Sequence, residues 1–207
     1  MKIKKIILLF YIILYIKPIF SSNLPSLELQ KRLEKINGFC GKFNQKIIDQ
    51  SGLNIEESQG NIWMKNTNTF KIQTIYPEEN LIISDSKNIY YYHPSLKQVT
   101  IILLSDLNLN TPFVLFTNHD KKNWEQYKIN QNKNNFFLVP KLKNLNFKYF
   151  FITIQSNGKL EELGIVEQNG QKNIFIISHY KKIMLKKDLF KFNFKKNILI
   201  DDQRSKK

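Results

Sequence analysis

The sequence predicts a mainly β fold, in which one antiparallel sheet curves into a half-open barrel or a strongly coiled sheet. Apolar and aromatic residues alternate with polar residues over short runs, as the two-residue period of a strand requires. Clusters of Asn, Asp, Ser, Pro and Gly separate these runs. A chain of 207 residues is long enough for one domain that has a core or a cavity.

The N-terminal segment has the features of a secretory signal peptide. Lysines within the first five residues precede the apolar run at residues 6–16, and Ser21 and Ser22 provide small residues at its end. We therefore expect residues 1–22 to be removed as a signal peptide and residues 23–207 to form one domain. An uncleaved N-terminal anchor is the alternative.

Residues 27–36 are predicted to form an amphipathic helix. Leu29, Leu33 and Ile36 fall on one stripe of this helix, and charged residues occupy the rest of its surface. Ser26 precedes the helix and is available as its N-cap. The apolar stripe must cover another apolar surface, which we expect to be the sheet.

Strands are predicted wherever the alternation persists. They fall at residues 39–48, 55–65, 70–76, 81–83, 89–93, 99–103, 127–131, 136–139, 149–154, 160–166 and 173–180. Asn157-Gly158 and Asn169-Gly170 predict hairpins with two-residue loops. Phe190, Phe192 and Phe194 alternate with polar residues, which predicts a last strand near the C-terminus.

A second, short helix is predicted at residues 112–116. Asn110 or Thr111 can cap it, and Pro112 suits its first turn. This apolar segment must lie against an apolar surface, and packing in the core explains it about as well as a functional role. Its large side chains include Phe113, Leu115 and Phe116.

The chain is strongly basic, with 32 Lys plus Arg against 17 Asp plus Glu and a net charge of +15. Such a charge is compatible with binding to nucleic acid or to an anionic membrane. Four of the lysines belong to the predicted signal peptide, and most of the others are dispersed along the chain. We therefore favour a basic, solvated surface, and a nucleic-acid-binding module is the second hypothesis.

The motifs of common catalytic sites are missing from the sequence, including nucleophile elbows, glycine-rich phosphate loops and zinc-binding helices. His93, His119 and His179 do not have the spacing of metal ligands. Cys40 has no base beside it and is predicted to be an inert strand thiol. We expect no catalytic residue, no metal and no cofactor, and a periplasmic lipid-processing enzyme is the third hypothesis.

Residues 60–94 carry the motifs that identify a family. Gly60-x-Ile-Trp-x-Lys is followed by a strand that contains Phe70, and residues 77–94 have the sequence PEENLIISDSKNIYYYHP. This pattern resembles the periplasmic outer-membrane lipoprotein carrier LolA. The resemblance continues in one register through Trp124-x-Gln-Tyr to Asp201-Asp-Gln-Arg, so it covers nearly the whole chain after the N-terminal segment.

The resemblance implies a half-open β-barrel closed by an α-helical lid over a hydrophobic cavity, with the helices at 27–36 and 112–116 forming the cover. It implies a monomeric periplasmic chaperone that takes triacylated lipoproteins from an inner-membrane ABC transporter and passes them to an outer-membrane receptor. Binding of nucleic acid is not expected. The residues predicted to line the cavity and the lid are Leu33, Phe39, Phe43, Ile62, Met64, Phe70, Ile72, Phe113, Leu115 and Phe116.

One departure from the family concerns the lid latch. In the family, Lys-Arg-Pro follows the Trp, and the Arg is thought to donate hydrogen bonds that hold the lid shut. This chain has Lys65, Asn66 and Thr67 instead. Because Asn has fewer donors and a shorter reach than Arg, we expect Asn66 to form a weaker latch. Phe70 matches the family's Phe at the cavity rim and is expected to contact cargo or the transporter.

Overall fold

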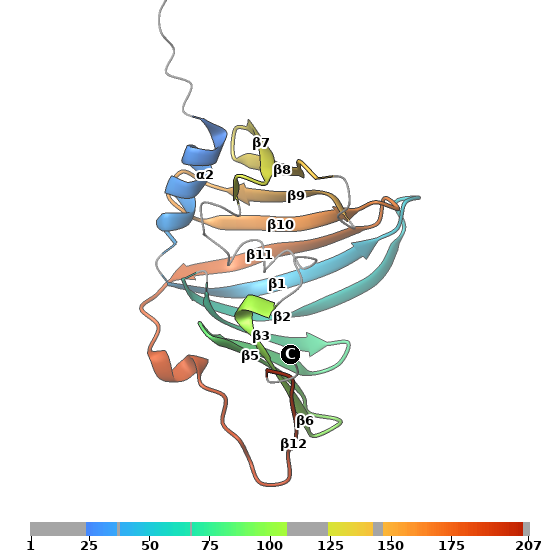
Figure 1. Ribbon diagram of the computed structural model, residues 1–207, viewed down its shortest axis with the longest axis vertical. Helices are drawn as coiled ribbons and strands as arrows, with labels where there is room; N and C mark the ends of the chain where they lie inside the picture. The colour runs from blue at the N-terminus through green and yellow to red at the C-terminus, as the bar shows by residue number, and fades with distance from the viewer. Residues whose placement is uncertain (1–23, 37, 67, 107–123, 143–146, 205–207) are drawn as a thin grey trace, which may run out of the picture.

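The computed structural model describes residues 24–36, 38–66, 68–106, 124–142 and 147–204, except for the side chain of Asn66. Its main feature is a twelve-stranded, strongly curved sheet that is not closed (Figure 1). The strand order is β12-β6-β5-β4-β3-β2-β1-β11-β10-β9-β8-β7. The prediction of a mainly β, unclosed sheet is confirmed.

The elements follow the predicted runs closely. In chain order they are α2 (Pro25–Glu34), β1 (Phe39–Ile48), β2 (Asn54–Asn66), β3 (Thr69–Tyr76), β4 (Asn80–Asp85), β5 (Asn88–His93), β6 (Gln98–Leu103), η2 (Leu104–Asp106), β7 (Tyr127–Asn132), β8 (Asn135–Pro140), β9 (Phe147–Ile154), β10 (Leu160–Glu167), β11 (Lys172–Lys182), η3 (Lys187–Phe190) and β12 (Leu199–Asp202).

The helix α2 begins earlier than predicted. Pro25 lies at the start of the helix and Leu24 is the N-cap residue, without a side-chain hydrogen bond. The prediction that Ser26 caps the helix is therefore wrong. Proline favours the first turn because its fixed φ is already helical and its missing N–H has no partner there in any case.

The hairpins at the two Asn-Gly pairs are present, but their loops have three residues instead of the predicted two. The backbone amide of Gln155 donates to the carbonyl of Lys159 at 2.9 Å. In the second hairpin, the backbone amide of Glu167 donates to the carbonyl of Gln171 at 2.8 Å. In each loop the glycine is the third residue, and its positive φ completes the turn. Residues 49–53 close in the same way around Gly52.

The C-terminal region differs from the prediction. Residues 190–194 do not form a strand. The chain instead leaves β11, forms η3 and returns to the sheet edge as β12, which pairs in parallel with β6 (Figure 1). Phe190 is buried on the outer face of the sheet with Ile83 and Leu185, and Trp63 and Tyr90 pack against them. The aromatic residues in this segment therefore cover the sheet instead of extending it.

The inner face of the sheet holds the main core. Leu29 and Leu33 of α2 are buried in one cluster with Phe136 of β8 and Phe150 of β9. The guanidinium of Arg32 lies 5.1 Å from the centre of the Phe136 ring. The helix α2 therefore covers the β7–β9 end of the inner face (Figure 1).

Two predicted segments lie outside the described residues, namely the signal peptide at 1–22 and the short helix at 112–116. Among the residues that are described, none of the helices combines the length and the apolar character that crossing a membrane requires.

Candidate functional site

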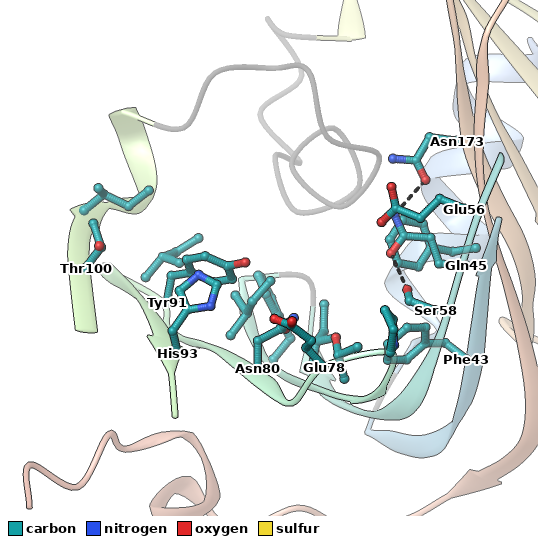
Figure 2. Close-up of a pocket in the computed structure, with 18 of the residues that line it drawn as sticks. Phe43, Gln45, Glu56, Ser58, Glu78, Asn80, Tyr91, His93, Thr100 and Asn173 are labelled. Carbon is teal, nitrogen blue, oxygen red and sulfur yellow. Dashed lines mark hydrogen bonds between the residues drawn. The ribbon is translucent and has the colours of Figure 1, made fainter. Parts of the chain in front are cut away.

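A cavity of about 790 Å³ lies on the inner face of β1–β6 and β11 (Figure 2). Alternate residues of each strand face it, so the register aligns Ile72 of β3 with Ile82 of β4 and then with Tyr91 of β5. The volume falls in the range of roughly 300–1,000 Å³ that is typical of small-ligand sites. Its apolar lining includes Phe43, Phe70, Ile72, Pro77, Ile82, Ile89, Ile102 and Phe175.

A row of polar side chains crosses one wall of the cavity. The amide nitrogen of Gln45 donates to Oδ1 of Asn173 at 3.0 Å, and the hydroxyl of Ser58 donates to Oε1 of Gln45 at 3.0 Å (Figure 2). These bonds join β11, β1 and β2 across the sheet. Because the polar atoms satisfy one another, this wall can contact an apolar ligand with a smaller desolvation cost than unpaired polar groups would impose.

The opposite wall carries Tyr91 and His93, whose rings meet edge to face with centroids 4.3 Å apart. Figure 2 shows both side chains across the cavity from Gln45 and Ser58. Burial raises the pKa of the Tyr91 phenol, so this group stays neutral at physiological pH. The Tyr91 ring therefore offers the cavity a neutral aromatic surface with a polar edge.

Carboxylates reach the cavity at its rim. Glu56 and Glu78 contribute to the lining, and Figure 2 shows them at the margin of the apolar floor. Among the described residues, no group of three His, Cys, Asp or Glu side chains is placed to hold a metal ion. The arrangement consists of an apolar floor with polar margins, which suits a ligand with an apolar body and a polar end.

The structure separates the predicted cavity residues into two groups. Three of them line the cavity, namely Phe43, Phe70 and Ile72. Four others are packed in the core with at most 2% of their surface exposed, namely Leu33, Phe39, Ile62 and Met64. Phe113, Leu115, Phe116 and the side chain of Asn66 lie outside the described residues. Ligand contact by any of these residues stays a prediction.

Several cavity residues were missing from the predicted set, including Ile82, Ile89, Ile102 and Phe175. Each lies on a strand whose apolar and polar residues alternate, so the sequence predicts which face of the strand its side chain occupies. The missing information was the pairing between strands. Phe175, for example, reaches the cavity because β11 pairs with β1, although these two strands are far apart in the sequence. Its ring lies 5.8 Å from that of Phe43.

Comparison with protein families gives a match over most of the chain. Residues 34–193 match the family described as outer membrane lipoprotein carrier protein LolA. A protein named outer-membrane lipoprotein carrier protein from Actinobacillus pleuropneumoniae serotype 7 (strain AP76) is 38% identical over 180 residues, which cover 87% of this chain and 84% of the relative. A protein of the same name from Erwinia tasmaniensis is 35% identical over 177 residues, which cover 86% of this chain and 87% of the relative.

Comparison with solved structures supports the fold. The crystal structure of an uncharacterized conserved protein from Thermus thermophilus superposes with a TM-score of 0.53 at 12% sequence identity. The match covers 85% of this chain and 97% of that protein. At this identity the likeness concerns the architecture of the sheet.

Proposed function

This chain belongs to the LolA family of outer membrane lipoprotein carrier proteins, and we propose that it binds the acyl chains of lipoproteins and carries them through the periplasm. The observation that carries this proposal is the apolar cavity on the inner face of the sheet. The family consists of carriers and not of enzymes, so the cavity is a binding site in this proposal.

The physical need for a carrier follows from the hydrophobic effect. Each acyl methylene that leaves water gains about 0.8 kcal/mol, so a triacylated lipoprotein is insoluble without an apolar partner. A cavity with an apolar floor provides this partner. In this proposal the polar margin of the cavity faces the protein part of the cargo. Release is possible when the open and closed forms of the carrier differ by only a few kcal/mol.

The proposed pathway has three partners. Residues 1–22 direct the chain to the periplasm, and residues 23–207 act there as one monomeric carrier domain. An inner-membrane ABC transporter loads triacylated lipoproteins, and an outer-membrane receptor accepts them. Family membership and the apolar cavity support this proposal over the nucleic-acid-binding and enzymatic hypotheses.

The test of carriage uses spheroplasts that retain newly made outer-membrane lipoproteins. Purified protein that starts at Asn23 is added, and the supernatant is assayed for a soluble complex that contains one carrier and one lipoprotein. Formation of the complex is the expected result. If folded protein releases no lipoprotein, the proposal is contradicted, and either the lid latch is lost or the cavity serves another apolar ligand.

Phe70 provides a test of cargo contact inside the cavity. Phe70→Glu places a charge on the apolar floor, and we expect it to abolish loading because desolvating a carboxylate is costly. Gln73→Glu is the matched control, because it adds the same charge on the opposite face of β3, in register with Leu81. Equal loading by the two variants in the spheroplast assay would count against cargo contact at Phe70.

We also propose that Asn66 makes the lid latch weaker than the family's Arg does. The sequence supports this proposal, because the amide of Asn66 has fewer donors than a guanidinium group. Asn66→Arg is expected to lower the binding of a hydrophobic dye, because a tighter latch keeps the cavity closed. Unchanged dye fluorescence in this variant would remove the basis of the proposal.

A further inference from the structure

The segment of residues 181–196, which runs from the end of β11 toward β12, concentrates positive charge. Although most lysines are dispersed along the chain, seven of them lie within these sixteen residues, against one acidic residue, Asp188. The net charge of this basic segment is therefore +6. All seven lysines are exposed, and they are Lys181, Lys182, Lys186, Lys187, Lys191, Lys195 and Lys196.

The ion pair within the basic segment does little to neutralise it. Lys191 Nζ lies 2.7 Å from Oδ1 of Asp188, but the two side chains are 69% and 80% exposed. Ion pairs this exposed contribute little because solvent and salt screen them. The lysines of the segment therefore present their charge to the surroundings.

Apolar side chains are exposed between these lysines. Met184 is 96% exposed, Phe194 is 52% exposed and Ile183 is 45% exposed. Met184 precedes Lys186 by two residues in the chain, and Phe194 directly precedes Lys195 and Lys196. Solvated apolar groups beside clustered lysines form the combination that binds the boundary between lipid headgroups and acyl chains.

The sheet holds the basic segment in place. Leu185 and Phe190 are buried against Ile83 on the outer face. The ring of Phe192 stacks on that of Tyr90, with centroids 5.5 Å apart and planes 7° apart. Figure 1 shows the segment running along the side of the sheet between β11 and β12. Its exposed groups are therefore presented by an ordered surface, which lowers the entropy cost of binding.

We propose that the basic segment docks the protein on an anionic phospholipid bilayer. The charges are complementary, because each lysine near such a surface strengthens binding by roughly fivefold. Two of the three exposed apolar side chains, Met184 and Ile183, favour lipid over nucleic acid, because they cannot stack on bases as the ring of Phe194 can. The segment also has no arginine, the residue most used for reading nucleic acids.

Docking through the basic segment leaves the cavity accessible. The segment packs on the outer face, at Ile83 and Tyr90, whereas the neighbouring residues Ile82 and Ile89 face the cavity. A strand directs successive side chains to opposite faces, so the two sites lie on opposite sides of β4 and β5. The proposal does not depend on carriage of lipoproteins.

The experiment measures partition of the protein onto vesicles by flotation. The chain that starts at Asn23 is used, since it holds every described element and lacks the predicted signal peptide, which would itself bind membranes. We expect binding to vesicles of phosphatidylglycerol mixed with phosphatidylcholine, no binding to phosphatidylcholine alone, and loss of binding at high salt. Absence of binding to the phosphatidylglycerol vesicles at low salt would overturn the proposal.

Two charge variants locate the surface. The combined change Lys186→Gln, Lys187→Gln, Lys195→Gln and Lys196→Gln is expected to weaken vesicle binding by roughly a hundredfold or more. The control carries Lys42→Gln, Lys128→Gln, Lys148→Gln and Lys172→Gln, which removes the same charge from exposed sites on β1, β7, β9 and the opposite end of β11. It should bind within about threefold of the unmodified protein, since distant charges are screened. An equal loss in both variants would show that only net charge matters, which overturns the proposal.

Two further measurements test the contribution of exposed apolar side chains to vesicle binding and the competing hypothesis that the segment binds nucleic acid. Met184→Ser is expected to weaken vesicle binding by about fivefold, because it removes apolar surface that would leave water. Leu53→Ser is the control, since Leu53 is 63% exposed in the loop after β1. Equal binding by both variants, or tighter binding of the unmodified protein to duplex DNA than to the vesicles, would contradict the proposal.

Discussion

Asp85 organises the turn between β4 and β5 through both of its carboxylate oxygens. Oδ1 accepts hydrogen bonds from the backbone amides of Lys87 and Asn88 at 2.9 and 2.7 Å. Oδ2 accepts bonds from the side chains of Asn88 and Tyr90, each at 3.1 Å. Arg204 in turn donates to Oδ1 of Asn88, which joins the end of the chain to this turn. One carboxylate therefore supports both a hairpin and the C-terminal region.

These hydrogen bonds make stability depend on the charge of Asp85. Partial burial acts to raise the pKa of Asp85, but the hydrogen bonds from Asn88 and Lys87 outweigh it and hold the pKa below its ordinary value. A carboxyl whose pKa is lower in the folded state stabilises the fold above its unfolded pKa of about 3.9. This stabilisation is lost as the pH falls through the folded pKa.

We predict that Asp85→Asn lowers the free energy of unfolding by about 1 kcal/mol near neutral pH and has a smaller effect below about pH 3. Urea unfolding at the two pH values measures the difference. Glu79→Gln is the control, because Glu79 is exposed in the neighbouring turn. An Asp85 effect that is equal at both pH values would contradict the prediction.

At the scale of elements, α2 is attached to the sheet by a polar clamp as well as by its apolar stripe. Arg32 Nη1 donates to the carbonyl of Ile154 at 2.7 Å and to Oδ1 of Asn134 at 2.8 Å. Its Nε donates to Oε1 of Glu28 at 2.8 Å within the helix. Only 7% of Arg32 is exposed. The helix is thereby fixed in direction as well as in position.

We predict that Arg32→Gln destabilises the protein by about 2 to 3 kcal/mol, because it removes charge-assisted hydrogen bonds and leaves a buried carbonyl without its partner. Lys31→Gln is the matched control, since Lys31 is the exposed neighbour on the same helix. Chemical denaturation measures both variants. A similarly small loss of stability in the two variants would show that the apolar stripe alone holds α2 on the sheet.

At the scale of the molecule, one inner face serves two purposes. Under α2 the face is filled, and Ile152 and Phe136 have no exposed surface. Toward β4–β6 the same face opens into the cavity, where Ile82 remains partly exposed. The filled half provides stability, and the open half keeps apolar surface available for a ligand.

We predict that this division appears in the cost of matched truncations. Ile152→Ala should lower the free energy of unfolding by about 3 to 4 kcal/mol, because it opens a void in a packed core. Ile82→Ala should cost less than about half of that, since one side of Ile82 already faces the cavity. Thermal or urea unfolding compares them. Equal costs would mean that both halves of the inner face are packed alike.

Local patterns in the sequence were sufficient to predict most of the strands, the fold class and the family. The face of a strand residue follows from its position in the two-residue period, so the alternation at residues 55–65 predicts Ile62 and Met64 on the face opposite Trp63. The structure agrees, with Ile62 and Met64 in the main core and Trp63 packed on the outer face. The Asn-Gly pairs likewise located two hairpins. The length of their loops was wrong, because a single positive φ at glycine also suits a three-residue loop.

Contacts between distant parts of the chain settled the remaining features. The alternation of Phe190, Phe192 and Phe194 predicts a strand locally, yet the apolar outer face of β4 and β5 needed a cover, and burial there outweighs β-propensity. The cavity likewise depends on β11 pairing with β1, and on α2 covering one half of the inner face but not the other. A period of two assigns each side chain to a face, whereas the three-dimensional arrangement of the sheet determines which part of that face is filled and which stays open.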